Sequence, residues 1–380
     1  MPKVVIDARS VVEKKSGIGN YTEALVRHIV PLAEDVEFTL LRHPAAQKPI
    51  LEHPRVLELA FEGETKSPHT VFRMTRHLDF SSFDLYHSPA DLVPLRLPCP
   101  YVVTLHDLMW VERPELASAF LPVRLANGAW YRANFAHAVR GARGIIAISE
   151  ATKAAIGRVY PRHVHKVSVV HHGMDHARYK RQSAGPRSLL DKWLAPAERF
   201  SLIVGQGSPY KNHVGMVRAF VEASRHDREH KLILVRRFSR IDQEMNRLLA
   251  RPDVRRQVLV VPFVSDAELL ALYAHAQMLL FVSHYEGFGL PALEAMSMGT
   301  PVLASTAEAV QEITGDGALH VDSRDHAAIV QGIRRLATDP ALRDALRSRG
   351  MRRTQQFSWQ KCAELTLAAY RRALRGPAPG

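Results

Sequence analysis

Short apolar runs alternate with helical periodicity along the whole chain, and this alternation constrains the fold more than any other feature. Each run predicts a buried strand, and the segments between the runs carry apolar residues at helical spacing. Such a succession of strand and helix is typical of an α/β fold with mainly parallel sheets. The expected strands cover residues 4–6, 38–41, 85–86, 102–105, 145–148, 167–170, 202–204, 232–235, 259–261, 278–282 and 301–304.

The second half of the chain repeats the layout of the first half, which predicts two doubly wound domains. A chain of 380 residues is long enough for two cores of ordinary size. We expect an N-terminal domain over 1–180, a Gly- and Pro-containing linker over 181–199 and a C-terminal domain over 200–357. A last helix over 358–376 is predicted, with Ser358 as its N-cap.

Composition indicates a globular protein without a disulfide framework. Hydrophobic residues make up 46% of the chain, and no apolar run reaches the roughly 18 residues of a membrane span. The N-terminus passes directly into a strand pattern, so we expect a cytoplasmic protein. Cys99 and Cys362 are too few for a disulfide framework or a cysteine-based zinc site, and the sequence implies neither a metal nor a cofactor.

The formal net charge of +13 predicts an anionic partner. No signature of a nucleic-acid-binding module is present, so nucleic acid is not expected as a partner. The segment 124–143 places Arg124, Arg132 and Arg140 near one face of a predicted helix, with aromatic residues between them. Two interpretations remain open: a helix that contacts an anionic membrane from the cytoplasmic side, and a core-packed helix with a solvated basic face.

The segment from Glu286 to Glu294 lies between a predicted buried strand and a helix that begins near Pro291. Unpaired backbone N–H groups and the positive end of the helix dipole face outward at such a position, where a diphosphate can bind. Gly287 and Gly289 allow the backbone to approach a ligand closely. Two carboxylates facing one pocket require hydrogen-bond donors, which the hydroxyls at both ends of a sugar nucleotide supply.

A second phosphate-binding geometry follows the predicted strand 202–204. Gly205 begins a loop that leads to Lys211, Asn212 and a helix. A glycine-rich loop and a lysine beside a helix N-terminus suit a diphosphate, because the ammonium neutralises charge that grows as the bond between sugar and phosphate breaks.

These two segments resemble the Glu-x7-Glu and Gly-x-x-x-Pro-Arg-Lys-Asn signatures of retaining GT-B glycosyltransferases of family 4. The resemblance covers practically the whole chain. It implies two Rossmann-like domains facing a cleft, with the C-terminal helix crossing back to the N-terminal domain. The subgroup that the chain is most similar to is that of bacterial mannosyltransferases.

The resemblance also implies roles for residues of the C-terminal domain. The donor sugar would contact Glu286 and the loop Gly287, Phe288, Gly289 and Leu290, and the nucleotide ribose would contact Glu294. The donor phosphates would contact Lys211, with Gly205 and Asn212 in the same loop. Tyr210 and Gln206 stand where relatives carry arginine, so Arg236 or Arg237 would replace the second phosphate contact, or else form an exposed basic rim.

In the N-terminal domain, Gly17 and Gly19 resemble a family loop that faces the catalytic cleft. His106 and Asp107 follow the predicted strand 102–105 and resemble the family's Thr-x-His-Asp-Leu segment. By this resemblance His106 lies beside the donor's anomeric carbon, and Asp107 orients it or shapes the acceptor side. His87 is expected either to contact the acceptor or to pack in the core.

The resemblance implies a metal-independent, retaining hexosyltransferase that takes a nucleoside-diphosphate sugar as donor and a glycan or lipid-linked hydroxyl as acceptor. Front-face attack is expected, with Glu286 as the competing candidate for a nucleophile. GDP-mannose in the synthesis of bacterial surface polysaccharide is the favoured donor, and UDP-glucose or a UDP-amino sugar remains open. Two other functions remain as alternatives: a nucleotide-sugar epimerase on a similar scaffold, and a non-catalytic glycan-binding protein.

Overall fold

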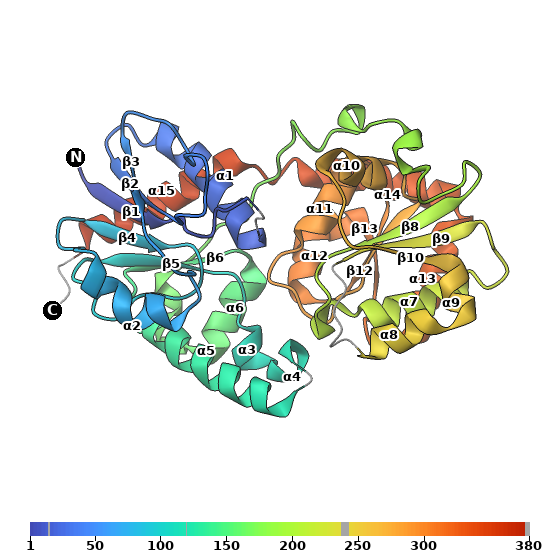
Figure 1. The fold of residues 1–380 in the computed structure, drawn as a ribbon, viewed down its shortest axis with the longest axis horizontal. Helices are drawn as coiled ribbons and strands as arrows, with labels where there is room; N and C mark the ends of the chain where they lie inside the picture. The colour runs from blue at the N-terminus through green and yellow to red at the C-terminus, as the bar shows by residue number, and fades with distance from the viewer. Residues whose placement is uncertain (14–15, 119, 237–242, 377–380) are drawn as a thin grey trace. The chain divides into compact units, whose positions relative to one another are not determined.

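The computed structural model describes residues 1–13, 16–118, 120–236 and 243–376. It divides into two compact units, and Figure 1 shows a sheet with helices around it in each. The first unit holds Met1–Pro114, Pro122–Gly173 and Phe357–Gly380, and the second holds Glu115–Leu121 and Met174–Gln356. The predicted α/β class with two parallel sheets is confirmed.

The sheet of the first unit has the strand order β3-β2-β1-β4-β5-β6-β7, and every pair is parallel. The order reverses between β1 and β4, which is where open α/β sheets bind ligands. The strands are β1 Lys3–Asp7, β2 Glu37–Arg42, β3 Val56–Ala60, β4 Leu85–Ser88, β5 Tyr101–Leu105, β6 Gly144–Ala147 and β7 Val167–Val169. The α-helices of the first unit are α1 Gly17–Leu32, α2 Pro68–His77, α3 Met109–Glu112, α5 Leu121–Gly141, α6 Glu150–Val159 and α15 Trp359–Arg375. Only Leu121, the first residue of α5, is assigned to the second unit.

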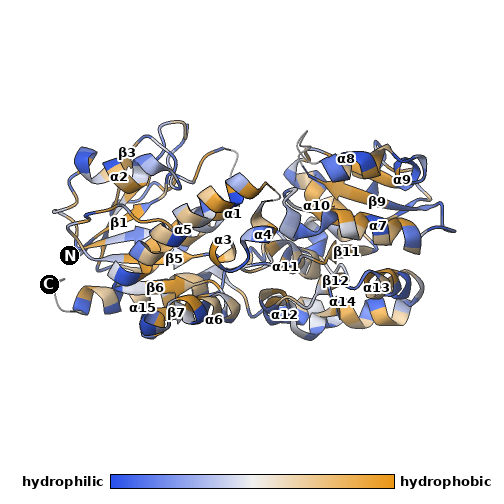
Figure 2. Ribbon diagram, turned by 90° about the horizontal axis from the view of Figure 1, so that it is seen from below, coloured by the Kyte–Doolittle hydropathy of each residue, from blue (hydrophilic) through white to orange (hydrophobic). Residues whose placement is uncertain are grey.

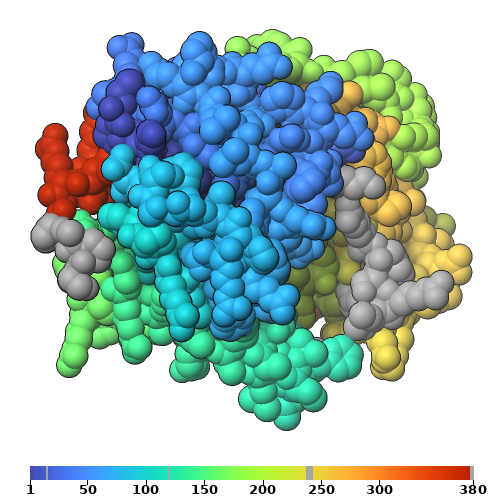
Figure 3. Space-filling model, turned by 60° about the vertical axis from the view of Figure 1, so that its left-hand side comes forward, coloured from blue at the N-terminus to red at the C-terminus, as the bar shows by residue number. Residues whose placement is uncertain are grey.

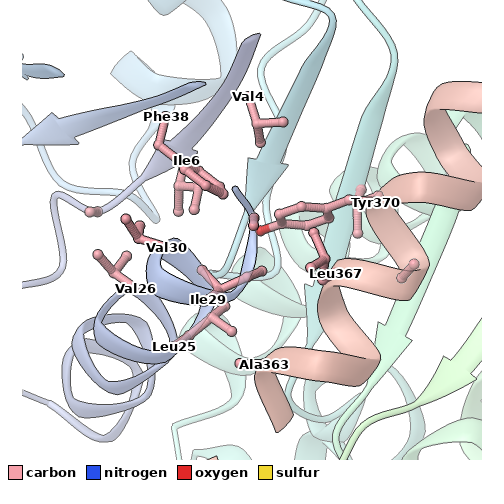
Figure 4. Packing of buried hydrophobic residues seen from close by; sticks show 14 of the residues in the cluster. Val4, Ile6, Leu25, Val26, Ile29, Val30, Phe38, Ala363, Leu367 and Tyr370 are labelled. Carbon is pink, nitrogen blue, oxygen red and sulfur yellow. The ribbon is translucent and has the colours of Figure 1, made fainter. Parts of the chain in front are cut away.

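Helix α15 completes the core of the first unit, as the resemblance implied. Ser358 caps the helix, since its side chain accepts a hydrogen bond from the N–H of Lys361 at 3.1 Å. Leu367 and Tyr370 of α15 belong to the same buried cluster as Leu25 and Ile29 of α1 (Figure 4). The core of the first unit is therefore built from both ends of the chain.

The sheet of the second unit has the order β10-β9-β8-β11-β12-β13, again with every pair parallel. The order reverses between β8 and β11. The strands are β8 Arg199–Val204, β9 His230–Val235, β10 Val258–Val261, β11 Met278–Phe281, β12 Val302–Ser305 and β13 Ala318–Val321. The helices are α7 His213–Ala223, α8 Gln243–Ala250, α9 Pro252–Gln257, α10 Asp266–His275, α11 Leu290–Ser297, α12 Glu308–Thr314, α13 His326–Thr338 and α14 Pro340–Thr354. The short helix α4, Pro114–Ala117, belongs to the second unit except for its first residue.

Burial on both faces explains the apolar runs of the central strands. Every residue of β5 and of β11 is buried, because helices cover both faces of a parallel sheet. In Figure 2, β5 and β9 are coloured as hydrophobic, whereas a surface helix such as α13 carries both hydrophobic and hydrophilic residues. Within the described part of the chain, no helix combines the length and the apolarity that crossing a membrane requires.

Candidate active site

Two loops of the second unit leave neighbouring strands at the point where the strand order reverses. Met278 of β11 pairs with Ser201 of β8, so the loop after each strand emerges at the same edge of the sheet. The structure brings their predicted site residues into contact: Nζ of Lys211 donates to Oε1 of Glu286 at 2.6 Å and to Oε2 at 2.9 Å. Parallel pairing of β8 with β11 therefore assembles the pair from segments far apart in the sequence.

The Lys211–Glu286 pair is largely shielded from water, with side-chain exposures of 14% and 8%. The ammonium also lies 5.2 Å from the ring centroid of Tyr210 and 5.5 Å from that of Phe281. Aromatic faces attract a cation. A carboxylate and two rings thus hold the lysine at the carboxyl edge of the sheet.

Arg236 follows β9 and reaches the loop that carries Lys211. A Cβ atom added to Gly207 would lie 1.9 Å from a guanidinium nitrogen of Arg236, so the guanidinium group rests directly against this glycine. Burial first, and then the charges of Arg236 and Lys211, lower the pKa of His213 to about 3. Both cations therefore act on the same loop. Arg237, the other candidate, lies outside the described residues.

Asn212 fastens this loop to the sheet. Its backbone is left-handed, with φ 54°, and its side-chain amide donates to the carbonyls of Val282 and Ser323, both at 3.1 Å. Gly205, the first residue after β8, has φ 153°, which favours glycine. A contact of Asn212 or Gly205 with a donor stays a prediction, while the structure gives each a role in shaping the loop.

The loop after β11 enters helix α11 through Gly289, whose φ of 128° strains any other residue. Leu290 begins the helix and Pro291 lies in its first turn, as predicted. Phe288 is buried, and a contact of its backbone with the donor stays a prediction. The geometry offers the N-terminal amides of α11 at the carboxyl edge of the sheet.

Glu294, one turn inside α11, is held by two tyrosines that sequence reasoning missed. Its Oε1 accepts from the hydroxyl of Tyr179 at 2.9 Å, and its Oε2 accepts from that of Tyr273 at 2.8 Å. Burial raises the pKa of Glu294 above its usual range, although both hydrogen bonds and the charge of Arg178 lower it. The pair Leu272-Tyr273 resembles a family segment, but neither tyrosine has a sequence signal for contact with Glu294, so only the fold reveals that role.

His106 lies at the end of β5 in the first unit, as predicted. Its Nε2 is 2.8 Å from the carbonyl of Pro89, which requires a proton on Nε2 and leaves Nδ1 as an acceptor. Burial lowers the pKa of His106, an effect that the Asp91 carboxylate only partly offsets. The imidazole is therefore neutral at pH 7.

A partly buried ion pair beside His106 escaped the sequence analysis. Asp91 has a left-handed backbone, with φ 67°, and its Oδ1 accepts from the backbone N–H of His106 at 2.7 Å. Its Oδ2 pairs with the ammonium of Lys66. Asp91 is 3% exposed, and although burial raises its pKa, the charge of Lys66 and the hydrogen bonds from Lys66 and the N–H of His106 hold the pKa below its usual range. An isolated Asp after a strand gives no sequence signal for this role.

Asp107 and His87 make local contacts. Oδ1 of Asp107 accepts from the N–H of Met109 at 2.9 Å, and burial raises the pKa of this carboxyl. His87 is fully buried, with Nε2 2.9 Å from the hydroxyl of Thr104 and Nδ1 2.6 Å from that of Tyr370. Both ring nitrogens are engaged inside the core, which corrects the placement of His87 on the acceptor side in favour of the packing alternative.

Gly17 and Gly19 lie in the first turn of α1, and not in a loop as expected. Ser16 caps this helix by accepting from the N–H of Gly19 at 3.2 Å. Because Ser16 caps the helix, α1 begins at Gly17, and the expected loop ends before the Gly-x-Gly segment. A Cβ atom on Gly17 would meet nothing within 4 Å, so the turn leaves open space beside it.

No group of three or more His, Cys, Asp or Glu side chains that could hold a metal ion occurs in the ranges that the structure describes. Independence from metal stays a prediction.

Solved structures share this two-sheet architecture. Sucrose-phosphate synthase from Thermosynechococcus elongatus superposes with a TM-score of 0.75 at 20% sequence identity, covering 98% of each chain. Anabaena HepE in complex with UDP and glucose superposes with a TM-score of 0.71 at 18% identity, covering 98% of this chain and 99% of that one. The fold of the two units is that of a GT-B glycosyltransferase.

Sequence comparison gives the family. Residues 15–178 match the family described as Glycosyltransferase Family 4, and residues 191–353 match Glycosyl transferases group 1. The O-antigen chain mannosyltransferase B of Escherichia coli is 26% identical over 389 residues, which cover 97% of this chain and 99% of that protein. The chain belongs to glycosyltransferase family 4, as its motifs indicated.

Proposed function

We propose that this glycosyltransferase moves a mannosyl residue from GDP-mannose to a hydroxyl of a glycan or lipid-linked acceptor, with retention of configuration, in the synthesis of a bacterial surface polysaccharide. The similarity to an O-antigen chain mannosyltransferase along nearly the whole of both chains supports the choice of sugar and acceptor class. The two alternative functions are a nucleotide-sugar epimerase and a glycan-binding protein, and none of the three similar proteins described above has either name.

The observation that carries the proposal is the convergence of Lys211, Glu286 and Arg236 where the strand order of the second unit reverses. Two cations beside a helix N-terminus match the negative charge that develops on a departing diphosphate. Glu286 offers a carboxylate to the sugar hydroxyls. In this proposal the lysine and the arginine supply the positive charge that a metal ion supplies in other transferases.

The proposed step balances without a further reactant. The bond between the sugar C1 and the phosphate oxygen breaks, and its electron pair leaves with GDP. The acceptor oxygen forms its bond to C1 on the same face, and its proton passes to the departing phosphate. Glu286 then stays a hydrogen-bond acceptor and forms no covalent bond.

In the first unit, we assign to neutral His106 a contact with the sugar hydroxyls through its acceptor nitrogen, Nδ1. The Lys66–Asp91 pair would fix the backbone at His106, because Asp91 accepts the N–H of that residue.

Incubation of the purified protein with GDP-mannose, UDP-glucose or UDP-N-acetylglucosamine, with and without a mannose-terminated acceptor, tests the proposal. We expect a new glycoside only with GDP-mannose. The one-bond coupling between C1 and H1 of the transferred mannose should show the same anomeric configuration as in the donor. An altered nucleotide sugar without a glycoside would indicate the epimerase, and an unchanged donor would indicate the glycan-binding protein. Intact-mass measurement of quenched wild-type reactions tests the step itself, because a hexose adduct on Glu286 would establish double displacement.

We further propose that α2 and the N-terminal half of α5 contact an anionic membrane. The buried residues of α5 all lie in its second half, while Val123 and Leu125 are 46% and 63% exposed. Phe72 of α2 is 52% exposed and meets Trp130 of α5 edge to face at 5.8 Å. Exposed apolar side chains beside arginines are typical of a surface that enters an anionic lipid headgroup layer.

Charge on α2 supports the same surface. Arg73 and Arg76 are exposed, and neither forms an ion pair with any carboxylate that the structure describes. Figure 3 shows one face of the first unit, coloured by residue number. Residues in the colour range of α2 (light blue) lie on this face, and residues in the colour range of the start of α5 (blue-green) lie below them. In this proposal the N-terminal half of α5 contacts the membrane and its second half packs in the core.

A further inference from the structure

Glu294 lies in a closed frame of hydrogen bonds that fixes its carboxylate from both sides. Tyr179 and Tyr273 each donate a hydroxyl to one of its oxygens. The same two tyrosines are tied back to the end of α11: the hydroxyl of Ser297 donates to the carbonyl of Tyr179 at 2.7 Å, and that of Thr300 donates to the carbonyl of Tyr273. The frame therefore joins the side chain and backbone of both tyrosines to helix α11 and the turn that follows it.

Packing makes this frame rigid. Tyr273 is fully buried and Tyr179 is 9% exposed, and their rings meet edge to face with centroids 6.4 Å apart. The guanidinium of Arg178 lies 5.4 Å above the ring of Tyr179 and pairs with Asp266 at 2.8 Å. Neither hydroxyl can swing away from Glu294 without disturbing this packing of the two rings.

We propose that Tyr179 and Tyr273 are positioning residues that set the preference of the enzyme for a ribonucleotide over a 2′-deoxyribonucleotide. This inference rests on the proposed function, in which Glu294 binds the ribose of the donor. Each oxygen of the carboxylate already accepts one tyrosine hydroxyl. The remaining lone pairs point in two fixed directions, which suit the neighbouring 2′ and 3′ hydroxyls of ribose.

A carboxylate held in one orientation distinguishes a ribonucleotide from a 2′-deoxyribonucleotide more strongly than a carboxylate that can rotate. When the 2′ hydroxyl is absent, one oxygen of Glu294 cannot rotate to find another donor and stays underpaired in a shielded site. Without the tyrosine hydroxyls, the carboxylate can turn toward the single remaining ribose hydroxyl, so the preference for ribose falls.

Calorimetric titration with GDP and 2′-deoxy-GDP, and with UDP and 2′-deoxy-UDP, measures this preference directly. For wild-type protein we expect the better ribonucleotide to bind about 10- to 100-fold more tightly than its deoxy form. Tyr273→Phe and Tyr179→Phe keep the ring and remove the hydroxyl. Each should lower that ratio by about threefold or more. In steady-state assays the KM for the donor should rise while kcat changes little, because the ribose contact is the same in ground and transition states.

Tyr101→Phe is the matched control, since Tyr101 is a buried tyrosine of the other unit whose hydroxyl donates to backbone carbonyls. It should leave the ratio unchanged. In a Glu294→Gln background, the tyrosine substitutions should have no further effect on the ratio. Equal weakening of ribo and deoxy forms by Tyr273→Phe would show a structural role only and would overturn the inference. Failure of wild-type protein to bind either ribonucleotide would instead remove the proposed function.

Discussion

The ammonium of Lys211 lies within hydrogen-bond distance of both oxygens of Glu286, at 2.6 and 2.9 Å. The residue predicted for the donor phosphates thus neutralises the residue predicted for the donor sugar. In the proposed function, a bound nucleotide sugar would supply each side chain with a replacement partner: phosphate for the lysine and hydroxyls for the glutamate.

Lys211→Ala should lower kcat by about 10²- to 10³-fold, because the charge on the leaving phosphate grows in the transition state. The affinity for nucleoside diphosphate should fall much less. Initial rates at saturating donor, with calorimetry on the same preparation, measure the two effects. Lys231→Ala is the matched control, since Lys231 donates to the carbonyl of Arg256, away from the loops of the site. A loss confined to donor affinity would contradict the assigned role.

Gly207→Ala should weaken nucleoside diphosphate binding by displacing Arg236, since a Cβ atom at this position would overlap its guanidinium group. We expect a loss of about 1.5–3 kcal/mol, the contribution of a charge-assisted hydrogen bond. Gly128→Ala is the matched control, because its Cβ would lie 3.6 Å from the nearest atom, within helix α5. If Gly207→Ala binds GDP and UDP as wild type does, Arg236 is not a phosphate ligand.

Leu125→Ser should reduce partitioning onto vesicles that contain anionic phospholipid by about tenfold, because an exposed apolar side chain is removed from the proposed membrane surface. Partitioning of wild-type protein should also fall as salt rises, since salt screens the arginines beyond roughly 8 Å at physiological ionic strength. Leu57→Ser removes a leucine of similar exposure, 58% against 63%, from β3 and should change nothing. Vesicle sedimentation provides the measurement, and equal binding to neutral vesicles would count against the surface.

Stability should fall as the pH drops below about 6.5. Burial lowers the pKa of His87 to about 3, so the unfolded chain takes up this proton before the folded protein does. The stabilisation is complete above the ordinary histidine pKa of about 6.5, and each pH unit below it costs about 1.4 kcal/mol until the folded-state value is reached. Urea unfolding at pH 7 and pH 5 measures this loss. His87→Asn should be less stable at pH 7 but show a smaller pH dependence, and an unchanged dependence would contradict the assignment.

The central strands were predictable because burial on both faces leaves an unbroken apolar run in the sequence. Strands β3 and β13 were missed, and their place at a sheet edge does not explain this, because the edge strands β7 and β10 have similar burial and were predicted. In β3 and β13 an ionisable residue, Glu58 or His320, interrupts the short apolar run.

The candidate site likewise contains residues that were predictable from the sequence and residues that were not. Glu286, Lys211 and His106 were predictable because each follows a recognisable strand within a motif. Their partners were not: Tyr179 and Asp91 reach Glu294 and His106 from segments without periodicity or motif. Pairs of this kind depend on which strands become neighbours, and a single sequence does not state that order.

The contribution of α15 to the core of the first unit has a consequence for biosynthesis. A ribosome releases the chain from its N-terminus, yet Ala363, Leu367 and Tyr370 are the last core residues of that unit to be made. The second unit, nearly all of it within the continuous segment Met174–Gln356, is complete earlier. Domains commonly mature in the order of synthesis. Here the first unit cannot complete its core until α15 has been synthesised, which comes after the whole of the segment Met174–Gln356.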